Sequence, residues 1–154
     1  MTFKNQIKSK LRKGIFILVY YLENKIPKYL ILKRKLHWKG FEFPKGGIEK
    51  NERYIDAVKR ELKEETGLIP LKIKSHNFKG KYLYKKKFLD RTGFAGQTFV
   101  LFSVQTKNSK VFLDKREHSN YHWLSYEQAQ KKLAHQNQKK SLSIVDDWLM
   151  KNDN

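Results

Sequence analysis

Residues 46–68 read GGIEKNERYIDAVKRELKEETGL, and this stretch governs the interpretation of the rest of the chain. The residues from Asn51 to Thr66 are mostly good helix formers. We therefore predict a helix that has Asn51 as its N-cap and ends at Gly67. Three acidic residues occupy helical-neighbour positions on it: Glu61, Glu64 and Glu65. At about 100° per residue, these carboxylates overlap the edge of the helix that faces the core.

Three carboxylates on that edge are unfavourable unless a cation compensates them. Like charges at this spacing repel each other, and carboxylates near a half-buried edge lose hydration. Converging carboxylate oxygens suit Mg²⁺ or Mn²⁺, which bind a few carboxylates and keep water and substrate phosphate as their other ligands. The alternative is that these residues are solvated glutamates on a lysine-rich surface helix. The spacing alone does not distinguish the two interpretations.

The residues around these carboxylates resemble a known sequence signature. Gly46, Glu52 and the run Arg60-Glu61-Leu62-Lys63-Glu64-Glu65-Thr66-Gly67-Leu68 match the Nudix box, G-x5-E-x7-R-E-U-x-E-E-x-G-U with U apolar, at every specified position. This many positions at fixed spacing make a specific signal, whereas E-x-x-E-E alone would be a weak one. The elements predicted before and after the box also suit a Nudix domain, so we expect the resemblance to extend over most of the chain.

The resemblance implies a role for each position of the box. In Nudix hydrolases the metal ligands fall at the positions of Glu61, Glu64 and Glu65, often joined by the backbone carbonyl at the Gly46 position. Metal-assisted attack of water on phosphorus then cleaves a nucleoside diphosphate linked to another group. We expect Glu61 and Glu64 to be catalytic. Four residues are expected to support the box: Gly47 in a tight turn, Glu52 and Arg60 as a pair that ties loop to helix, and Gly67 at the helix end.

The sequence before the box bears on the substrate. Residues 38–52, WKGFEFPKGGIEKNE, resemble two Nudix branches, the asymmetric diadenosine tetraphosphate hydrolases and the RNA 5′-pyrophosphohydrolases. We expect Lys45 to bind a polyphosphate oxygen beside the metal loop; the alternative is an ordinary solvent-exposed lysine. Diadenosine tetraphosphate is the leading substrate. The alternative is the 5′-triphosphate of RNA, which a chain with a formal net charge of +19 would attract.

Two downstream segments also resemble both branches. Residues 93–102, GFAGQTFVLF, resemble their G-Q-x-x-x-F-L strand and make Gln97 a candidate substrate contact. Residues 116–129, REHSNYHWLSYEQA, resemble their E-x5-W-[LV] segment and make Glu117 the candidate carboxylate outside the box. Glu117 would be a further metal ligand or the catalytic base that accepts a proton from water. The alternative is a surface glutamate beside Arg116.

The remaining candidate substrate contacts rest on residue type. Tyr82 and Tyr84 have aromatic faces that stack on a nucleobase, although packing explains at least one of them equally well. Lys87 is a candidate phosphate contact in a run of three lysines, but such runs are more often solvated strand edges. Of the five histidines, His37 precedes the box and is a further candidate phosphate contact. No histidine is assigned as a metal ligand.

Composition indicates the class of protein. The chain has 154 residues, 39% of them hydrophobic, which predicts one folded domain rather than a disordered chain. We place that domain at residues 14–154, after a basic N-terminal segment at residues 1–13. The absence of cysteine excludes disulfides and thiolate metal sites and is compatible with a cytoplasmic protein. The apolar run at residues 14–22 is too short for a membrane helix, so we expect a buried strand and no membrane partner.

The order of predicted elements favours a mixed α/β (α+β) fold. We expect a hairpin over residues 14–34, a loop with one short extended segment at residues 37–47, and two helices after Ser125, which forms a capping box with Gln128. Further strands are predicted at residues 71–76, 82–88, 98–105 and 118–124. Strands on both sides of a central helix predict a Nudix-type α/β/α sandwich with a central mixed β-sheet, as a monomer or homodimer.

A non-catalytic Nudix module that binds nucleotide or RNA is an alternative of another class. Such modules can lack the metal-binding glutamates, and all of these are present here. We therefore expect an enzyme acting on phosphoric anhydride bonds. Its acidic pocket would lie within a basic surface that attracts polyanions.

Overall fold

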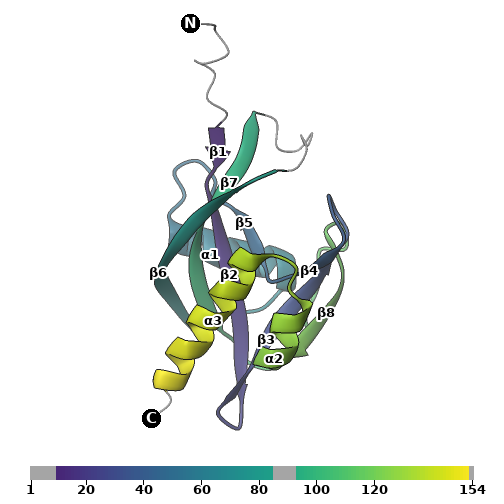
Figure 1. Cartoon of the computed structure of the whole chain (residues 1–154), viewed down its shortest axis with the longest axis vertical. Helices are drawn as coiled ribbons and strands as arrows, with labels where there is room; N and C mark the ends of the chain where they lie inside the picture. The colour runs from purple at the N-terminus through teal and green to yellow at the C-terminus, as the bar shows by residue number, and fades with distance from the viewer. Residues whose placement is uncertain (1–9, 85–92, 153–154) are drawn as a thin grey trace, which may run out of the picture.

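The computed structural model describes residues 10–84 and 93–152. That part of the chain forms eight strands and three helices (Figure 1). The strands are β1 (Lys10–Arg12), β2 (Gly14–Glu23), β3 (Ile26–Arg34), β4 (Gly40–Glu42), β5 (Lys45–Gly47), β6 (Lys72–Leu83), β7 (Phe94–Gln105) and β8 (His118–Leu124). The helices are α1 (Tyr54–Thr66), α2 (Tyr126–Lys132) and α3 (Gln136–Lys151). None of these helices is long and apolar enough to cross a membrane.

One mixed sheet contains the eight described strands. Its main order is β1-β7-β2-β3-β4, and β6 pairs with β7, β8 with β3, and β5 with β2. β7 runs parallel to β1 and β2, whereas the other pairings are antiparallel. The predicted central mixed sheet is confirmed.

Helices cover both faces of the sheet, with α1 on one side and α2 and α3 on the other (Figure 1). Successive side chains of a strand point to opposite faces, so the continuous apolar run of β2 contributes to two cores. One core joins Ile15, Ile17 and Val19 to Ala57, Val58 and Leu62 of α1. The other joins Phe16, Leu18 and Tyr20 to Ala129 of α2, to Leu142 and Val145 of α3, and to Leu133 between these helices. The predicted α/β/α sandwich is confirmed.

The predicted start of the central helix is wrong. α1 begins at Tyr54, with Arg53 as its N-cap, and Asn51 has a φ of 64° in the left-handed region. The intervening turn places the Glu52 carboxylate where Arg60 Nε donates to it at 2.8 Å. Asn51 therefore lies in a turn before the helix and is not its N-cap, and Glu52 in the same turn contacts Arg60 eight residues later.

Three strand predictions are also corrected. β6 is one strand from Lys72 to Leu83 with a bulge between His76 and Lys79, where the sequence predicts two strands; residues 85–88 of the second lie outside the described residues. β7 begins earlier than predicted, at Phe94, because its first residues pair with β1. Residues 37–47 contain two short strands, β4 and β5, instead of one extended segment. Gly47, predicted in a tight turn, instead lies in β5 and pairs with Gly14 of β2.

The other predicted elements are confirmed. β2 and β3 form the hairpin, β8 has the predicted bounds, and two helices close the described chain. The Ser125 hydroxyl accepts from Gln128 N at 3.3 Å, and the Gln128 side chain accepts from Ser125 N at 3.2 Å, which completes the capping box. β1 lies within residues 1–13, so the end of the basic segment pairs with the sheet.

Candidate active site

Seven of the residues singled out in the sequence line a small cavity of about 60 Å³. Three glutamates and three cationic side chains line it together with glycine and glutamine. The lining residues are Arg12, Arg34, Lys45, Gly46, Gly47, Glu61, Glu65, Gln97 and Glu117. They come from β1, β3, β5, α1, β7 and the loop before β8. The sheet and α1 thus place carboxylates and cations around one space.

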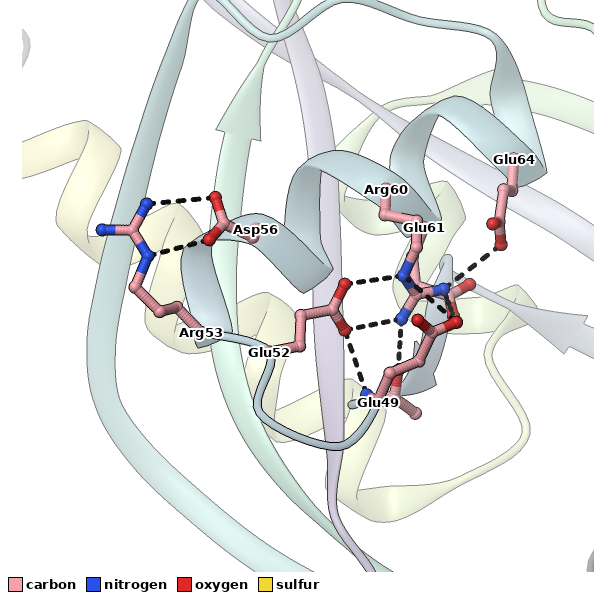
Figure 2. A network of polar contacts seen from close by, with 8 residues as sticks. Glu49, Glu52, Arg53, Asp56, Arg60, Glu61 and Glu64 are labelled. Carbon is pink, nitrogen blue, oxygen red and sulfur yellow. Dashed lines mark hydrogen bonds and ion pairs between the residues drawn. The ribbon is translucent and has the colours of Figure 1, made fainter.

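Arg60 joins the loop before α1 to the helix (Figure 2). Its Nε and Nη2 donate to the Glu52 carboxylate at 2.8 and 2.9 Å, and Nη2 also donates to the Gly47 carbonyl at 2.8 Å. The hydrogen bond from Arg60 lowers the pKa of Glu52 to about 2, so the pair is ionised at neutral pH. Glu52 and Arg60 lie in direct contact, as expected for the pair that ties loop to helix.

Two glycines of the box occupy positions where a side chain would be unfavourable. A Cβ on Gly46 would lie 2.2 Å from Glu61 Cδ. Gly67 has a φ of 70° and ends α1, with its N–H donating to the Lys63 carbonyl at 2.9 Å. The Gly46 carbonyl also accepts from Gln97 Nε2 at 3.4 Å, so β7 contacts the box loop.

The three box glutamates have different surroundings. Glu61 is 9% exposed and Glu65 is 4% exposed, and both line the cavity. The expectation that all three carboxylates overlap the core-facing edge is wrong for Glu64, whose side chain is 57% exposed and is not among the lining residues. Helix geometry explains this, because Glu64 lies about 60° further from the apolar stripe than Glu61 does. Arg60 Nη1 contacts Glu61 Oε1 at 2.9 Å and Glu64 Oε2 at 3.3 Å (Figure 2).

The buried glutamates are costly to ionise. Burial raises the pKa of Glu61 to about 7, although the hydrogen bond from Arg60 opposes this effect. Burial also raises the pKa of Glu65 well above its usual range, and the charges of Glu61 and Glu117 raise it further. Within the described residues, Glu65 Oε2 is buried without a hydrogen-bond partner. A bound cation would relieve this repulsion and satisfy the unpaired oxygen.

The donor set fits a hard divalent cation. Glu61, Glu65 and Glu117 offer carboxylate oxygens around the same cavity as Gly46, and oxygen is the donor that Mg²⁺ and Mn²⁺ prefer. Across residues 10–84 and 93–152, no three acidic or histidine side chains come close enough together to hold an ion. The carboxylates therefore share a cavity without converging on one point.

The model of the NUDIX domain matches residues 10–143 of the chain. The chain belongs to the Nudix hydrolase family. An RNA pyrophosphohydrolase of Pelagibacter ubique is 38% identical over 65 residues, 42% of this chain and 39% of that protein. An RNA pyrophosphohydrolase of Xylella fastidiosa is 46% identical over 37 residues, 24% of this chain and 20% of that protein. The matches thus span about two fifths or less of these relatives.

Solved structures share the Nudix fold. An Ap4A hydrolase of C. elegans, in a binary complex, superposes with a TM-score of 0.75 over 92% of this chain and 99% of that one, at 21% identity. The NUDIX domain of Shewanella oneidensis NrtR, complexed with ADP ribose, gives a TM-score of 0.74 over 97% and 99% of the two chains, at 13% identity. At these identities the likeness establishes the fold.

Lys45 of this Nudix chain is not an ordinary solvent-exposed lysine. Its side chain is 10% exposed, and Nζ lies 3.3 Å from Glu42 Oε1. Nζ is also 5.2 Å from the centre of the Tyr82 ring, which packs against Phe16 with a ring-centre separation of 6.2 Å. Tyr82 therefore packs beneath Lys45 and does not itself line the cavity.

The other candidate substrate contacts lie around the cavity lining. The Tyr84 hydroxyl donates to Gln97 Oε1 at 3.2 Å. His37 Nδ1 lies 3.4 Å from Arg34 Nη2, in a residue with a φ of 72°. Both residues contact a lining residue without lining the cavity themselves. Lys87 lies outside the described residues.

Sequence reasoning misses four polar residues of this Nudix site: Arg12, Arg34, Glu42 and His118. Arg12 and Arg34 line the cavity, while Glu42 and His118 are fully buried beside it. Burial alone would raise the pKa of Glu42, but Lys45, His118 and Arg34 outweigh it and lower the pKa to about 2. The sequence does contain one signal for Glu42, which lies between two phenylalanines in the stretch FEFP. An acidic residue in such an apolar stretch is buried only when it has a cationic or hydrogen-bonding partner.

Proposed function

We propose that this chain is a divalent-metal-dependent pyrophosphohydrolase that hydrolyses a phosphoric anhydride bond of a nucleotide polyphosphate. The observation that supports this is the cavity in which Glu61, Glu65 and Glu117 face the same space as three cationic side chains. Carboxylates suit a divalent cation, and Arg and Lys suit the phosphate oxygens that the cation would share. A cavity lined by carboxylates alone would bind the cation but repel phosphate, and one lined by Arg and Lys alone would bind phosphate but repel the cation.

The proposed ligands of Mg²⁺ or Mn²⁺ are Glu61, Glu65, Glu117 and the Gly46 carbonyl. When bound, the ion would lower the pKa of a ligand water and neutralise charge on phosphate. Glu64 is also a proposed ligand and catalytic residue. Its contact with Arg60 on the exposed side of α1 means that this role requires another side-chain rotamer.

Glu117 is the proposed base if it does not bind the ion. Its backbone is held on both sides, since Lys35 N donates to the Glu117 carbonyl at 2.8 Å and Glu117 N donates to the Asp114 carbonyl at 3.1 Å. The Glu117 side chain lines the cavity. A positioned carboxylate next to the reacting water is the requirement for general-base catalysis.

The size of the cavity limits what enters it. A volume of about 60 Å³ accommodates roughly four to six water-sized groups, enough for an ion and part of a phosphate chain. The nucleoside then lies outside, and Arg12, Arg34 and Lys45 contact phosphate. Diadenosine tetraphosphate remains the leading substrate, and the residues around PKGG resemble the branches that act on either candidate. The 5′-triphosphate of RNA is the second candidate, favoured by the two RNA pyrophosphohydrolase relatives.

A substrate panel tests this function. The protein with Mg²⁺ or Mn²⁺ is offered diadenosine tetraphosphate, nucleoside triphosphates, and capped or triphosphorylated RNA, in ¹⁸O water that marks the attacked phosphorus. We expect metal-dependent hydrolysis with the highest kcat/KM on diadenosine tetraphosphate. A kcat/KM on triphosphorylated RNA that is higher by orders of magnitude would overturn the substrate assignment.

Two variants test the residues behind the activity. Glu64→Gln should fold and lose most metal-dependent turnover. The matched control is Glu127→Gln, which changes an exposed glutamate in the first turn of α2, away from the cavity, and should keep full activity. Full activity of Glu64→Gln would contradict its assignment. Nucleotide binding in EDTA without hydrolysis under either metal would instead support a non-catalytic module.

A further inference from the structure

A buried carboxylate that the proposed reaction does not use lies beside the cavity. Glu42 ends β4 and is fully buried. Its Oε2 accepts from Arg34 Nη1 at 3.1 Å and from His118 Nε2 at 2.8 Å, and its Oε1 lies 3.3 Å from Lys45 Nζ. An arginine of β3, a lysine of β5 and a histidine of β8 therefore meet on one carboxylate.

The charge state of this group follows from its partners. Lys45, His118 and Arg34 lower the pKa of Glu42 to about 2, so its carboxylate is ionised and can only accept hydrogen bonds. His118 Nε2 must therefore carry the hydrogen in the contact with Glu42. Arg34 is fixed at a second point, where its Nε donates to the Leu36 carbonyl at 2.8 Å.

Arg34 and Lys45 line the same cavity as the three glutamates proposed to bind metal. Opposite charges around so small a space attract each other strongly, because little water screens them. If Arg34 or Lys45 paired with one of these glutamates, that glutamate could no longer bind the metal ion. The paired cation could no longer bind the phosphate. Glu42 offers both cations a buried anion outside the cavity lining.

We propose that Glu42 is a positioning residue that keeps Arg34 and Lys45 available to the phosphates of the substrate and apart from the metal-binding carboxylates. This inference rests on the proposed function, in which a polyphosphate enters the cavity. Without the charge on Glu42, the carboxylates that line the cavity with these two cations are Glu61, Glu65 and Glu117. The cations would then pair with them.

If Glu42 acted only through its charge and did not position Arg34 and Lys45, its neutralisation would strengthen phosphate binding. Glu42→Gln removes a negative charge next to the cavity and raises the net charge of the chain by one. A more positive site binds a polyanion more tightly if its side chains stay in place. A positioning role predicts weaker binding, because both cations turn toward Glu61, Glu65 and Glu117. The sign of the change therefore distinguishes the two.

The probe is inorganic tripolyphosphate, titrated calorimetrically into the full chain in EDTA at pH 8 and about 150 mM salt, where surface charges are largely screened. We expect Glu42→Gln to bind it about tenfold more weakly than the unsubstituted protein. In a Lys45→Met background, the same substitution should have a much smaller effect, because one of the two positioned cations is already absent.

Asp146→Asn is the matched control. It also neutralises a partly buried carboxylate, which accepts from the Tyr29 hydroxyl at 2.5 Å, but it lies in α3 away from the cavity lining. It should leave tripolyphosphate affinity unchanged or slightly raised. A variant that is merely less stable would not show the dependence on Lys45.

Several results would overturn the proposal: unchanged or tighter binding by Glu42→Gln, full additivity with Lys45→Met, or no binding by the unsubstituted protein. If Glu42→Gln does not fold, Glu42→Asp replaces it, because it keeps the charge but shortens the reach to both cations. Weaker binding by Glu42→Asp is then expected, and unchanged affinity overturns the proposal. No turnover is measured, so failure here is distinct from failure of the proposed hydrolase activity.

Discussion

Glu61→Gln should make the metal-free protein more stable than the unsubstituted protein at pH 8. Glu61 is 9% exposed, and burial raises its pKa from 4.5 to about 7. The folded chain therefore holds this proton more tightly than the unfolded chain. The resulting stabilisation is fully present below about pH 4.5 and is lost as the pH rises through about 7.

The size of the effect follows from the same pKa. The interval from 4.5 to about 7, at roughly 1.4 kcal/mol per pKa unit, corresponds to about 3 kcal/mol in the free energy of unfolding. Glutamine keeps an acceptor for Arg60 Nη1, which lies 2.9 Å from Glu61 Oε1, but it does not ionise. The stability of the variant relative to the unsubstituted protein should therefore increase by about 3 kcal/mol between pH 4.5 and pH 8.

Urea denaturation in EDTA across this pH range measures the effect. Glu64→Gln is the control, because Glu64 lies on the same helix and contacts the same arginine but is 57% exposed. Neutralising it removes no buried charge, so its effect on stability should change little with pH. A constant stability difference for Glu61→Gln from pH 5 to pH 8, or an equal change in both variants, would refute the reasoning.

Three further predictions concern the metal, the loop that contains Gly46, and the face of the sheet that α3 covers. Mn²⁺ should raise Tm more at pH 8 than at pH 5.5, because binding needs Glu61 and Glu65 ionised; equal shifts would contradict this. Gly46→Ala should lower kcat/KM about a hundredfold, since its Cβ would lie 2.2 Å from Glu61 Cδ, and normal kinetics would contradict the close approach. Tyr29→Phe removes the hydrogen bond to Asp146 and should cost about 1–3 kcal/mol in urea denaturation with unchanged kcat/KM; a large loss of activity would argue against its separation from the site.

Features that depend on neighbours along the chain are predictable here. The 100° step of a helix correctly predicts that Glu61 and Glu65 lie at the buried edge, but the same expectation is wrong for Glu64, whose side chain is 57% exposed. Gly67 ends the helix because a left-handed residue is needed there. Such features involve few residues and standard backbone geometry, so contacts elsewhere in the fold change them little.

Boundaries are less predictable, because tertiary contacts compete with local preferences. Asn51 is a good N-cap by residue type, yet the helix begins only at Tyr54. Residues 51–53 form a turn instead, in which Glu52 contacts Arg60 of the helix. Phe94 lies in a stretch rich in turn residues, but pairing with β1 makes it part of a strand. In both places the chain contacts a partner outside the local window.

Sequence alone is enough to recognise the family and the carboxylates of the box, and it predicts a cation beside them. It does not place Glu42 against His118, 76 residues away, or Gln97 against Gly46, 51 residues away. It also gives no sign that Arg12 and Arg34 line the cavity. Spacing within one helix follows from fixed backbone geometry, whereas pairing between distant strands depends on the register of the whole sheet. The tertiary structure therefore decides that Arg12, Arg34 and Lys45 line the cavity with the carboxylates, and that the buried Glu42 pairs with Arg34 and Lys45.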